Sequence, residues 1–361
     1  MVVNKDDTNA QWLLLLQDFN DMKFGRVAGE PVAKADADGN LWCFYVLFGK
    51  ADLDCEANSW GCPHYNSHEM CSLCLANDSN RPFTDFSAGA AWRPSAAAML
   101  NFAFMCRFRL PLHPLVASEY FDIDFMRLDL MHVADLNGIV ATVAGSMLID
   151  CIRMPALGVN QQIRLDAVNA NLFAYYARHP GCNRMPAIAL SNCTLEGWGF
   201  LHGPTVKAAN SRGLVPWLGE LSLELFAADT NYHISVRKIC ASLKNMYDVL
   251  YCGRRFLSDP EKQELACSVE RVGRHLGLLR ELSRIGGHFQ WQVKPKSHLL
   301  MHVPQQSRLI NSRFTQCYAE ESLVGRMTMI WKACVNGRYA NTVERHVMLK
   351  YLLSLTIMFE W

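Results

Sequence analysis

Long segments with helical patterning fill most of the chain after Leu136, and they constrain its fold more than any other feature. Apolar residues in these segments return every three or four positions, which places them on one face of a helix. Start signals support the boundaries, such as Asp259-Pro260 ahead of Glu261. The predicted helices cover residues 136–152, 160–178, 205–226, 231–256, 260–285, 294–303, 320–336 and 341–359.

Two shorter segments have the character of strands. Residues 41–48 form an uninterrupted apolar and aromatic run between Asn40 and Gly49, which is typical of a buried strand. Residues 120–130 alternate imperfectly between apolar and charged side chains, as a half-buried strand would. The sequence therefore predicts an α+β protein that is predominantly helical and has few strands.

The composition narrows the compartment and the class of protein. Residues 1–11 are polar and charged, so we expect no export signal and an intracellular chain. The longest apolar stretches, 139–149 and 351–359, are shorter than the roughly 20 residues of a membrane span, so we expect no membrane partner. Because we expect no export signal, we also expect the 14 cysteines to be thiols or metal ligands rather than disulfides. The net charge of +1 argues against a protein that coats nucleic acid through bulk charge.

A cluster of cysteines and histidines occupies positions 62 to 74. Its members are Cys62, His64, His68, Cys71 and Cys74. The Cys71-x-x-Cys74 spacing is that of a zinc knuckle, because two intervening residues let both thiolates face one ion. Cys55 competes with the first three members for the remaining positions of a structural zinc site. A redox pair and plain structural thiols are the other interpretations.

Two further histidines, His298 and His302, are four residues apart in a predicted helix and share one of its faces. Such a pair could bind a metal ion. No glutamate stands between them, so the His-Glu-x-x-His motif of metalloproteases is missing, and a packed pair is the favoured interpretation. The sequence also lacks the phosphate loops of nucleotide-binding proteins and the Gly-x-Ser-x-Gly elbow of hydrolases.

Three blocks of the sequence occur in the order of a known family. The first is the knuckle at 71–74, and the second is Asp129-Leu-Met-His132. The third joins Lys-Pro-Lys-Ser-His-Leu-Leu-Met-His at 294–302 to Tyr-Ala-Glu-Glu-Ser-Leu-Val-Gly at 318–325. Together they resemble RNase H-like DDE/DDD transposases, especially the branch with CACTA-type and Plavaka-type elements. Residues 74–77, 81–86 and 90–93 look like transposon-encoded proteins of large protist genomes.

The resemblance implies a partial RNase H-like mixed sheet with a large helical insertion and a helical C-terminal region. In that arrangement residues 1–94 carry the knuckle loop and 95–158 the core strand. Residues 159–290 form the helical insertion and 291–361 the C-terminal part. Because no convincing first acid stands on the opening strand, the resemblance also predicts a truncated or degenerate copy of a transposase.

The activity implied is DNA cleavage and strand transfer with Mg²⁺ or Mn²⁺ held by carboxylates. The resemblance gives ligand roles to Asp129 and Glu321, with Asp52 as the nearest candidate for the first acid. His132 would hold a leaving group or a carboxylate in position. The alternatives are structural: Asp129 accepting backbone hydrogen bonds, His132 in the core, and Glu321 at a helix start that favours acidic residues.

The partners that the resemblance implies are DNA and further copies of the chain, in the nucleus. Phosphate contacts would come from cations of the helical insertion, namely Lys207, Arg212, Arg237, Lys238, Arg254 and Arg255. Solvated helix faces are the other interpretation of these charges. The alternative function is a non-catalytic, zinc-stabilised helical protein that binds DNA or a protein partner.

Overall fold

The computed structural model describes residues 62–97, 126–194 and 197–335, together with a few isolated positions outside these ranges. The chain divides into two compact units, Met1–Thr315 and Gln316–Trp361. The predicted strand at 41–48, the first part of the one at 120–130 and most of the predicted helix at 341–359 lie outside the described residues.

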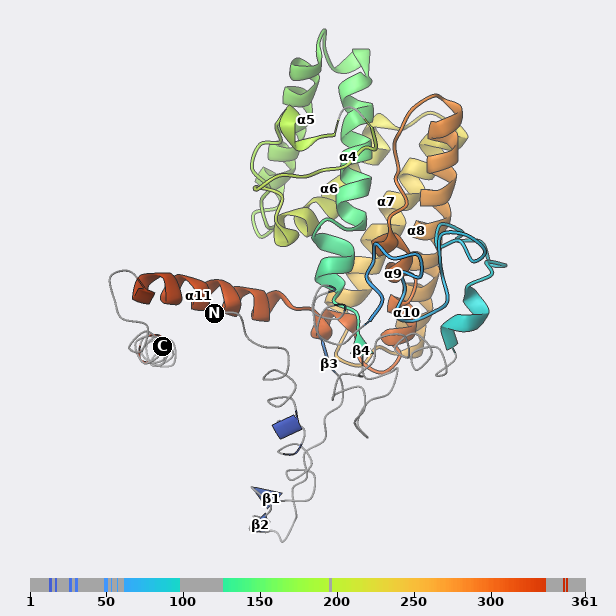
Figure 1. Cartoon of the computed structure of the whole chain (residues 1–361). Helices are drawn as coiled ribbons and strands as arrows, with labels where there is room; N and C mark the ends of the chain where they lie inside the picture. Colours follow the sequence, from blue (N-terminus) through green and yellow to red (C-terminus); the bar gives the residue numbers. More distant parts are fainter. Residues whose placement is uncertain are drawn as a thin grey trace. The chain divides into compact units, whose positions relative to one another are not determined.

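Helices dominate the described residues, as the sequence predicts (Figure 1). They are α4 (Ile139–Arg153), α5 (Gln161–Arg178), α6 (Ala208–Leu225), α7 (Asn231–Cys252), α8 (Asp259–Ile285), α9 (Pro295–Leu300), α10 (Val303–Gln306) and α11 (Tyr318–Val335). The shorter helical turns are η1 (Arg93–Ala97), the π-helix η2 (Met131–Asp135), η3 (Pro155–Leu157), η4 (Leu190–Asn192) and η5 (Ser312–Thr315).

The described strands are two residues long. β1 (Arg26–Val27) pairs antiparallel with β2 (Glu30–Pro31), and β3 (Gly49–Lys50) pairs parallel with β4 (Met126–Arg127). β4 lies within the second predicted strand, and β3 directly follows the first. The described residues therefore contain no RNase H-like sheet, although they place a parallel pair next to the two predicted strands.

The first unit is built around α4, in which nearly every residue is buried. This helix is apolar on all sides, so it must be covered all round, and α5, α6 and η2 pack against it. By length and hydropathy Met131–Arg153 could cross a membrane, but 83% of its most apolar window is buried within the protein. The central helix of a globular core has the same properties, so this segment is weak evidence for a membrane span.

α7 and α8 form a long helical hairpin beside this core (Figure 1). Thr230 caps α7 by accepting a hydrogen bond from the His233 amide at 3.2 Å. Ser258 and Glu261 cap α8, where the Ser258 amide donates to the Glu261 carboxylate at 2.7 Å. α7 ends at Cys252, earlier than predicted, because the backbone leaves the helical conformation at Gly253, where φ is −69° and ψ is 154°.

The predicted helix at 294–303 is shorter in the structure: α9 ends at Leu300, and α10 begins separately at Val303 and extends past the predicted end. Pro304 has no amide hydrogen, so it cannot donate to the Leu300 carbonyl as a continuous helix would require. The Met301 and His302 amides instead bond three residues back, to His298 and Leu299, at 2.9 and 3.1 Å. The resulting tight turn carries the functional residues described below.

A buried polar network fastens the end of α4. The Tyr232 hydroxyl donates to the Asp150 carboxylate at 2.7 Å, and the Gln290 amide donates to its other oxygen at 2.8 Å. Trp291, whose indole N–H donates to the Tyr232 oxygen at 2.7 Å, has a positive φ of 59°. Burial raises the pKa of Asp150 to about 6, although these hydrogen bonds oppose the rise.

Replacing Asp150 with asparagine should therefore remove the contribution of this carboxyl group to the pH dependence of the free energy of unfolding. A carboxyl group whose pKa rises on folding from 3.8 to about 6 stabilises the fold fully below pH 4, and this stabilisation is lost as the pH rises through 6. Relative to the wild type, we expect the free energy of unfolding of Asp150→Asn to rise by about 2 kcal/mol between pH 4.5 and pH 7.5. Urea unfolding at both pH values measures the difference, and a constant difference would contradict the prediction.

Candidate metal centre

The knuckle loop at 71–74 holds its two sulfur atoms with backbone groups. The Leu73 amide donates to the Cys71 sulfur at 3.4 Å, and the Ala76 amide donates to the Cys74 sulfur at 3.4 Å. Both cysteines have no exposed surface. Amide hydrogen atoms directed at sulfur stabilise the thiolate form, which is the form that binds metals.

His298 and His302 come from the segment that contains α9 and the start of α10. His298 lies within α9, and His302 immediately precedes α10. Both side chains are buried, with 0% and 2% of their surface exposed. α9 packs against η2 and α8, so the body of the first unit presents these two rings to the knuckle loop.

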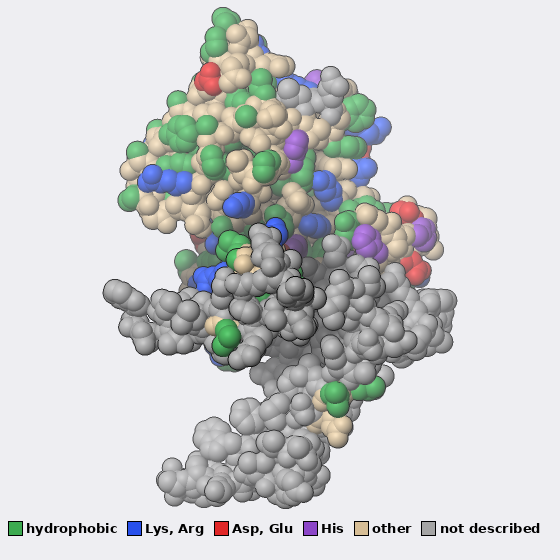
Figure 2. Space-filling view, turned by 60° about the vertical axis from the view of Figure 1, so that its left-hand side comes forward, with side chains coloured by type: hydrophobic (Ala, Val, Ile, Leu, Met, Phe, Trp, Pro, Cys, Tyr) green, Lys and Arg blue, Asp and Glu red, His purple; other side chains and the backbone are tan. Residues whose placement is uncertain are grey.

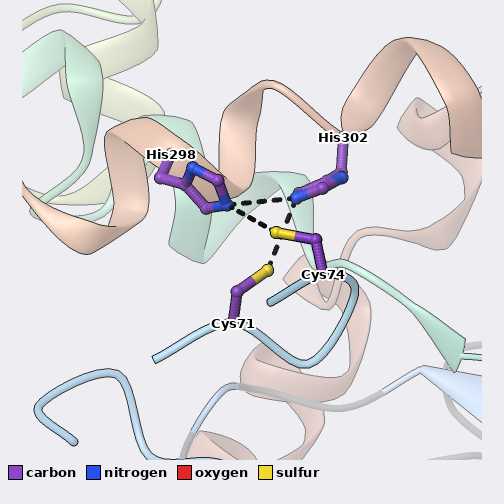
Figure 3. Close-up of side chains that lie close together, drawn as sticks. All are labelled: Cys71, Cys74, His298 and His302. Carbon is purple, nitrogen blue, oxygen red and sulfur yellow. Dashed lines mark hydrogen bonds between the residues drawn. The ribbon is translucent and has the colours of Figure 1, made fainter. Parts of the chain in front are cut away.

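The four side chains converge on one point (Figure 3). The Cys74 sulfur lies 3.2 Å from His298 Nε2, and the Cys71 sulfur lies 3.4 Å from His302 Nε2. The two Nε2 atoms are 3.2 Å apart, and all four ligand atoms lie within 4.8 Å of one another. Ideal bond lengths around a tetrahedral zinc ion place neighbouring ligand atoms about 3.3–3.8 Å apart. The cluster could therefore hold a metal ion such as zinc.

The protonation states favour this set of ligands. Burial lowers the pKa of His298, so its ring is neutral and can offer a lone pair to a metal. Burial and the neighbouring Cys74 raise the pKa of Cys71, so its thiolate would be costly in this buried position without a cation beside it. A divalent cation would offset that cost for both sulfur atoms at once.

The surroundings orient the ligands. The Trp92 ring packs edge-on against His298 with centroids 4.6 Å apart, and its indole N–H donates to the Asp85 carbonyl at 2.7 Å. Next to it, Arg93 bonds Glu270 of α8 at 2.8 Å and so ties the knuckle loop to the helical body. Gly273 of α8 lets the side chain of Met301, which precedes His302, pack close to the helix, since a Cβ there would lie 2.8 Å from the Met301 sulfur.

The structure corrects the predicted ligand set. Cys71 and Cys74 belong to the cluster as predicted, but His298 and His302 complete it. The Cys62 sulfur lies 3.8 Å from that of Met126, His64 accepts a hydrogen bond from the Asn66 amide, and exposed His68 pairs with Asp78. Cys55 lies outside the described residues.

The packed-pair interpretation of the two histidines was incomplete. The available signal was a Cys-x-x-Cys pair and a histidine pair at a spacing of four, each of which is half of a tetrahedral set. A separation of more than two hundred residues hid their relationship, because local sequence cannot show which distant segments meet.

The predicted acidic ligands lie in different parts of the chain. Asp129 is fully buried, accepts a hydrogen bond from the Met131 amide at 3.0 Å and contacts Nδ1 of His132. Glu321 is exposed on α11 in the second unit, and Asp52 lies outside the described residues. Within the described ranges no group of three carboxylates converges on a common point, so nothing there supports bound Mg²⁺ or Mn²⁺.

Of the cations predicted to contact phosphate, the lysines are exposed, whereas two of the arginines are hydrogen-bonded within the protein. Lys207 and Lys238 are exposed, and Figure 2 shows basic side chains scattered over the described part of one face. Arg237 donates to the Ala228 carbonyl at 3.1 Å, so it joins α7 to the loop before it. Arg212 donates to the Tyr251 hydroxyl at 2.6 Å.

No disulfide joins any of the cysteines in the described ranges. Comparison with known proteins gives no further guide to the site, since no family model, no curated protein and no solved structure matches the chain.

Proposed function

We propose that this chain is a non-catalytic, transposase-derived protein that binds DNA and whose fold is stabilised by a structural zinc ion. The observation that carries the proposal is the buried set of four protein ligands, Cys71, Cys74, His298 and His302. Structural zinc sites fill all four positions with side chains, whereas catalytic sites leave one for water or substrate. The completed set and its burial favour a structural role.

The transposase origin is supported by the way the similar blocks meet. The knuckle and the 294–302 block each supply two ligands to the same cluster. The remaining central block, Asp129-Leu-Met-His132, leads into η2, which packs against α9. The similar segments of the first unit, which lie far apart in sequence, thus gather in one region of it, whereas 318–325 belongs to the second unit.

Metal analysis tests the zinc part of the proposal. We expect the purified protein to contain one zinc per chain, measured by plasma mass spectrometry. X-ray absorption at the zinc edge should fit two sulfur and two nitrogen neighbours at about 2.3 and 2.0 Å. A substoichiometric metal content, or a shell rich in oxygen, would overturn the structural assignment.

A second candidate is metal-dependent phosphodiester cleavage, which the position of Asp129 at the end of β4 favours. An acid that follows a strand and contacts a histidine could take part in holding Mg²⁺ or Mn²⁺. The hydrogen bond from the Met131 amide to Asp129 is, however, what a structural carboxylate would make. We therefore place cleavage behind the non-catalytic proposal.

Plasmid nicking in Mn²⁺ separates the two candidates. The non-catalytic proposal expects equal, trace nicking by the wild type, Asp129→Asn and the surface control His68→Ala. A loss of about a hundredfold or more in Asp129→Asn alone, with unchanged circular dichroism, would favour the cleavage candidate.

A further inference from the structure

An exposed surface of arginine and phenylalanine lies where the turn between α7 and α8 meets η5. We call it the Arg–Phe surface, and its residues are Arg254, Arg255, Phe256, Arg313 and Phe314. Phe256 is 70% exposed and Phe314 is 39% exposed, and such exposed apolar side chains can mark an interaction site. All five residues belong to the first unit.

The backbone under this surface is held rigidly. Asn311, which has no exposed surface, donates through its side chain to the carbonyls of Leu250 at 2.8 Å and Arg254 at 3.1 Å. Its own amide donates to the Arg255 carbonyl at 2.8 Å. Leu257 is buried and anchors the other end of the turn. The surface is therefore preformed, which lowers the entropy cost of binding a partner.

Positive charges gather around two aromatic rings here. The guanidinium groups of Arg212 and Arg313 lie 4.7 and 5.0 Å from the Tyr251 ring centroid. Those of Arg255 and Arg313 lie 5.7 and 5.6 Å from that of Phe314. Planar guanidinium groups held on rings in this way are ordered, and they can still donate to phosphate from their edges.

Within the described part of the chain, no ion pair joins Arg254, Arg255 or Arg313 to a carboxylate. Glu261 attracts Arg254 electrostatically, and its carboxylate also accepts the hydrogen bonds of Ser258 at the start of α8. A bound polyanion can therefore contact these three arginines without displacing an ion pair.

We infer that the Arg–Phe surface binds single-stranded nucleic acid, with its arginines on the phosphates and Phe256 stacked on a base. Arginine beside exposed aromatic rings is the combination by which proteins hold single strands. A duplex would keep its bases away from the rings, so the arginines alone would bind it. The inference rests on the proposed DNA binding and adds where, and in which strand form, the nucleic acid is bound.

Fluorescence anisotropy with the zinc-loaded full chain tests the inference. The probes are a labelled single strand of mixed sequence, the same strand as a duplex, and vesicles containing anionic lipid. The variants are Arg254→Gln/Arg255→Gln and Phe256→Ala. The matched control is Arg178→Gln/Arg284→Gln, which removes two exposed arginines that are paired with glutamates elsewhere.

The expected results differ between the two kinds of variant. Losing two phosphate contacts should weaken single-strand binding by about tenfold or more and lower the slope of log affinity against log salt by roughly 1.4. Losing one stacking ring should weaken binding about 5- to 150-fold and leave the salt slope unchanged. The control pair should bind like the wild type.

The outcomes also separate this inference from the proposed function. If all variants bind nucleic acid as tightly as the wild type, the Arg–Phe surface is not the binding site, although the proposed DNA binding is still supported. A preference for duplex with no effect of Phe256→Ala overturns the single-strand assignment. Binding to anionic vesicles alone, or no binding at low salt by a wild type with intact circular dichroism, overturns both.

Discussion

Replacing Cys74 with serine should remove the metal from the protein and cost it most of its stability. Structural zinc contributes about 10–16 kcal/mol of apparent binding free energy in small zinc-dependent folds, which is as large as the whole stability of a typical domain. The loop at 62–97 has few regular hydrogen bonds of its own, and the cluster ties it to α9. We therefore expect metal content to fall from one zinc per chain to nearly none. Cooperative thermal unfolding should be lost or shifted far downward, as calorimetry measures.

Cysteine and histidine controls make this result specific. Cys252 is exposed and lies outside the cluster, so Cys252→Ser should keep both metal and melting temperature. His68→Ala should do the same, because His68 pairs with Asp78 at the surface. Equal loss of metal in His68→Ala, or full retention in Cys74→Ser, would contradict the assignment of the ligands.

Replacing Gly145 with alanine should destabilise the fold by several kcal/mol. A Cβ at this position of α4 would lie 2.3 Å from the carbonyl carbon of Phe200 and 2.4 Å from the amide nitrogen of Leu201. These are backbone atoms, and the Leu201 amide donates a hydrogen bond to the Ala141 carbonyl at 2.9 Å. The segment at 200–201 therefore cannot move away from α4 as easily as a side chain could change its rotamer. Overpacking costs about 1–3 kcal/mol in general, and a clash with fixed backbone belongs at or above the top of that range.

Gly277 provides the matched control on α8. A Cβ there would meet its nearest neighbour, the Phe86 ring, at an ordinary contact distance of 3.8 Å. Alanine in a helix interior is favoured over glycine by about 1 kcal/mol, so Gly277→Ala should be neutral or stabilising. Urea unfolding of both variants checks the contrast. A Gly145→Ala protein as stable as the wild type would show that residues 200–201 do not pack against α4 as described.

Helix formation in this chain is largely a local property. The signals at Asp259-Pro260 and the apolar periodicity placed α4, α5, α6 and α8 within a few residues of their observed bounds. α7 ended early because the backbone leaves the helical conformation at Gly253, and α9 ended at Leu300, one turn ahead of Pro304. Both residues are visible in the sequence, and each limits a helix in its own neighbourhood.

The candidate metal cluster was only half predictable. Two cysteines separated by two residues place their sulfur atoms together through the geometry of one turn, so the sequence alone determined that pair. The histidines needed the tertiary structure, because α9 reaches the knuckle only when η2 and α8 position it. Cys62 and His64 are close in sequence to the knuckle but are not part of the cluster of four, since nearness along the chain does not give convergence in space.

By itself, then, the sequence determined that the chain is predominantly helical, that the described cysteines are thiols and that one Cys-x-x-Cys pair faces a common point. These properties depend on neighbours within a few residues, whose geometry the backbone fixes. Only the tertiary structure decided that His298 and His302 complete the cluster and that arginines from α6, the α7–α8 turn and η5 gather around Tyr251 and Phe314. Such long-range contacts follow from how whole helices bury their apolar faces, which no single stretch of sequence records.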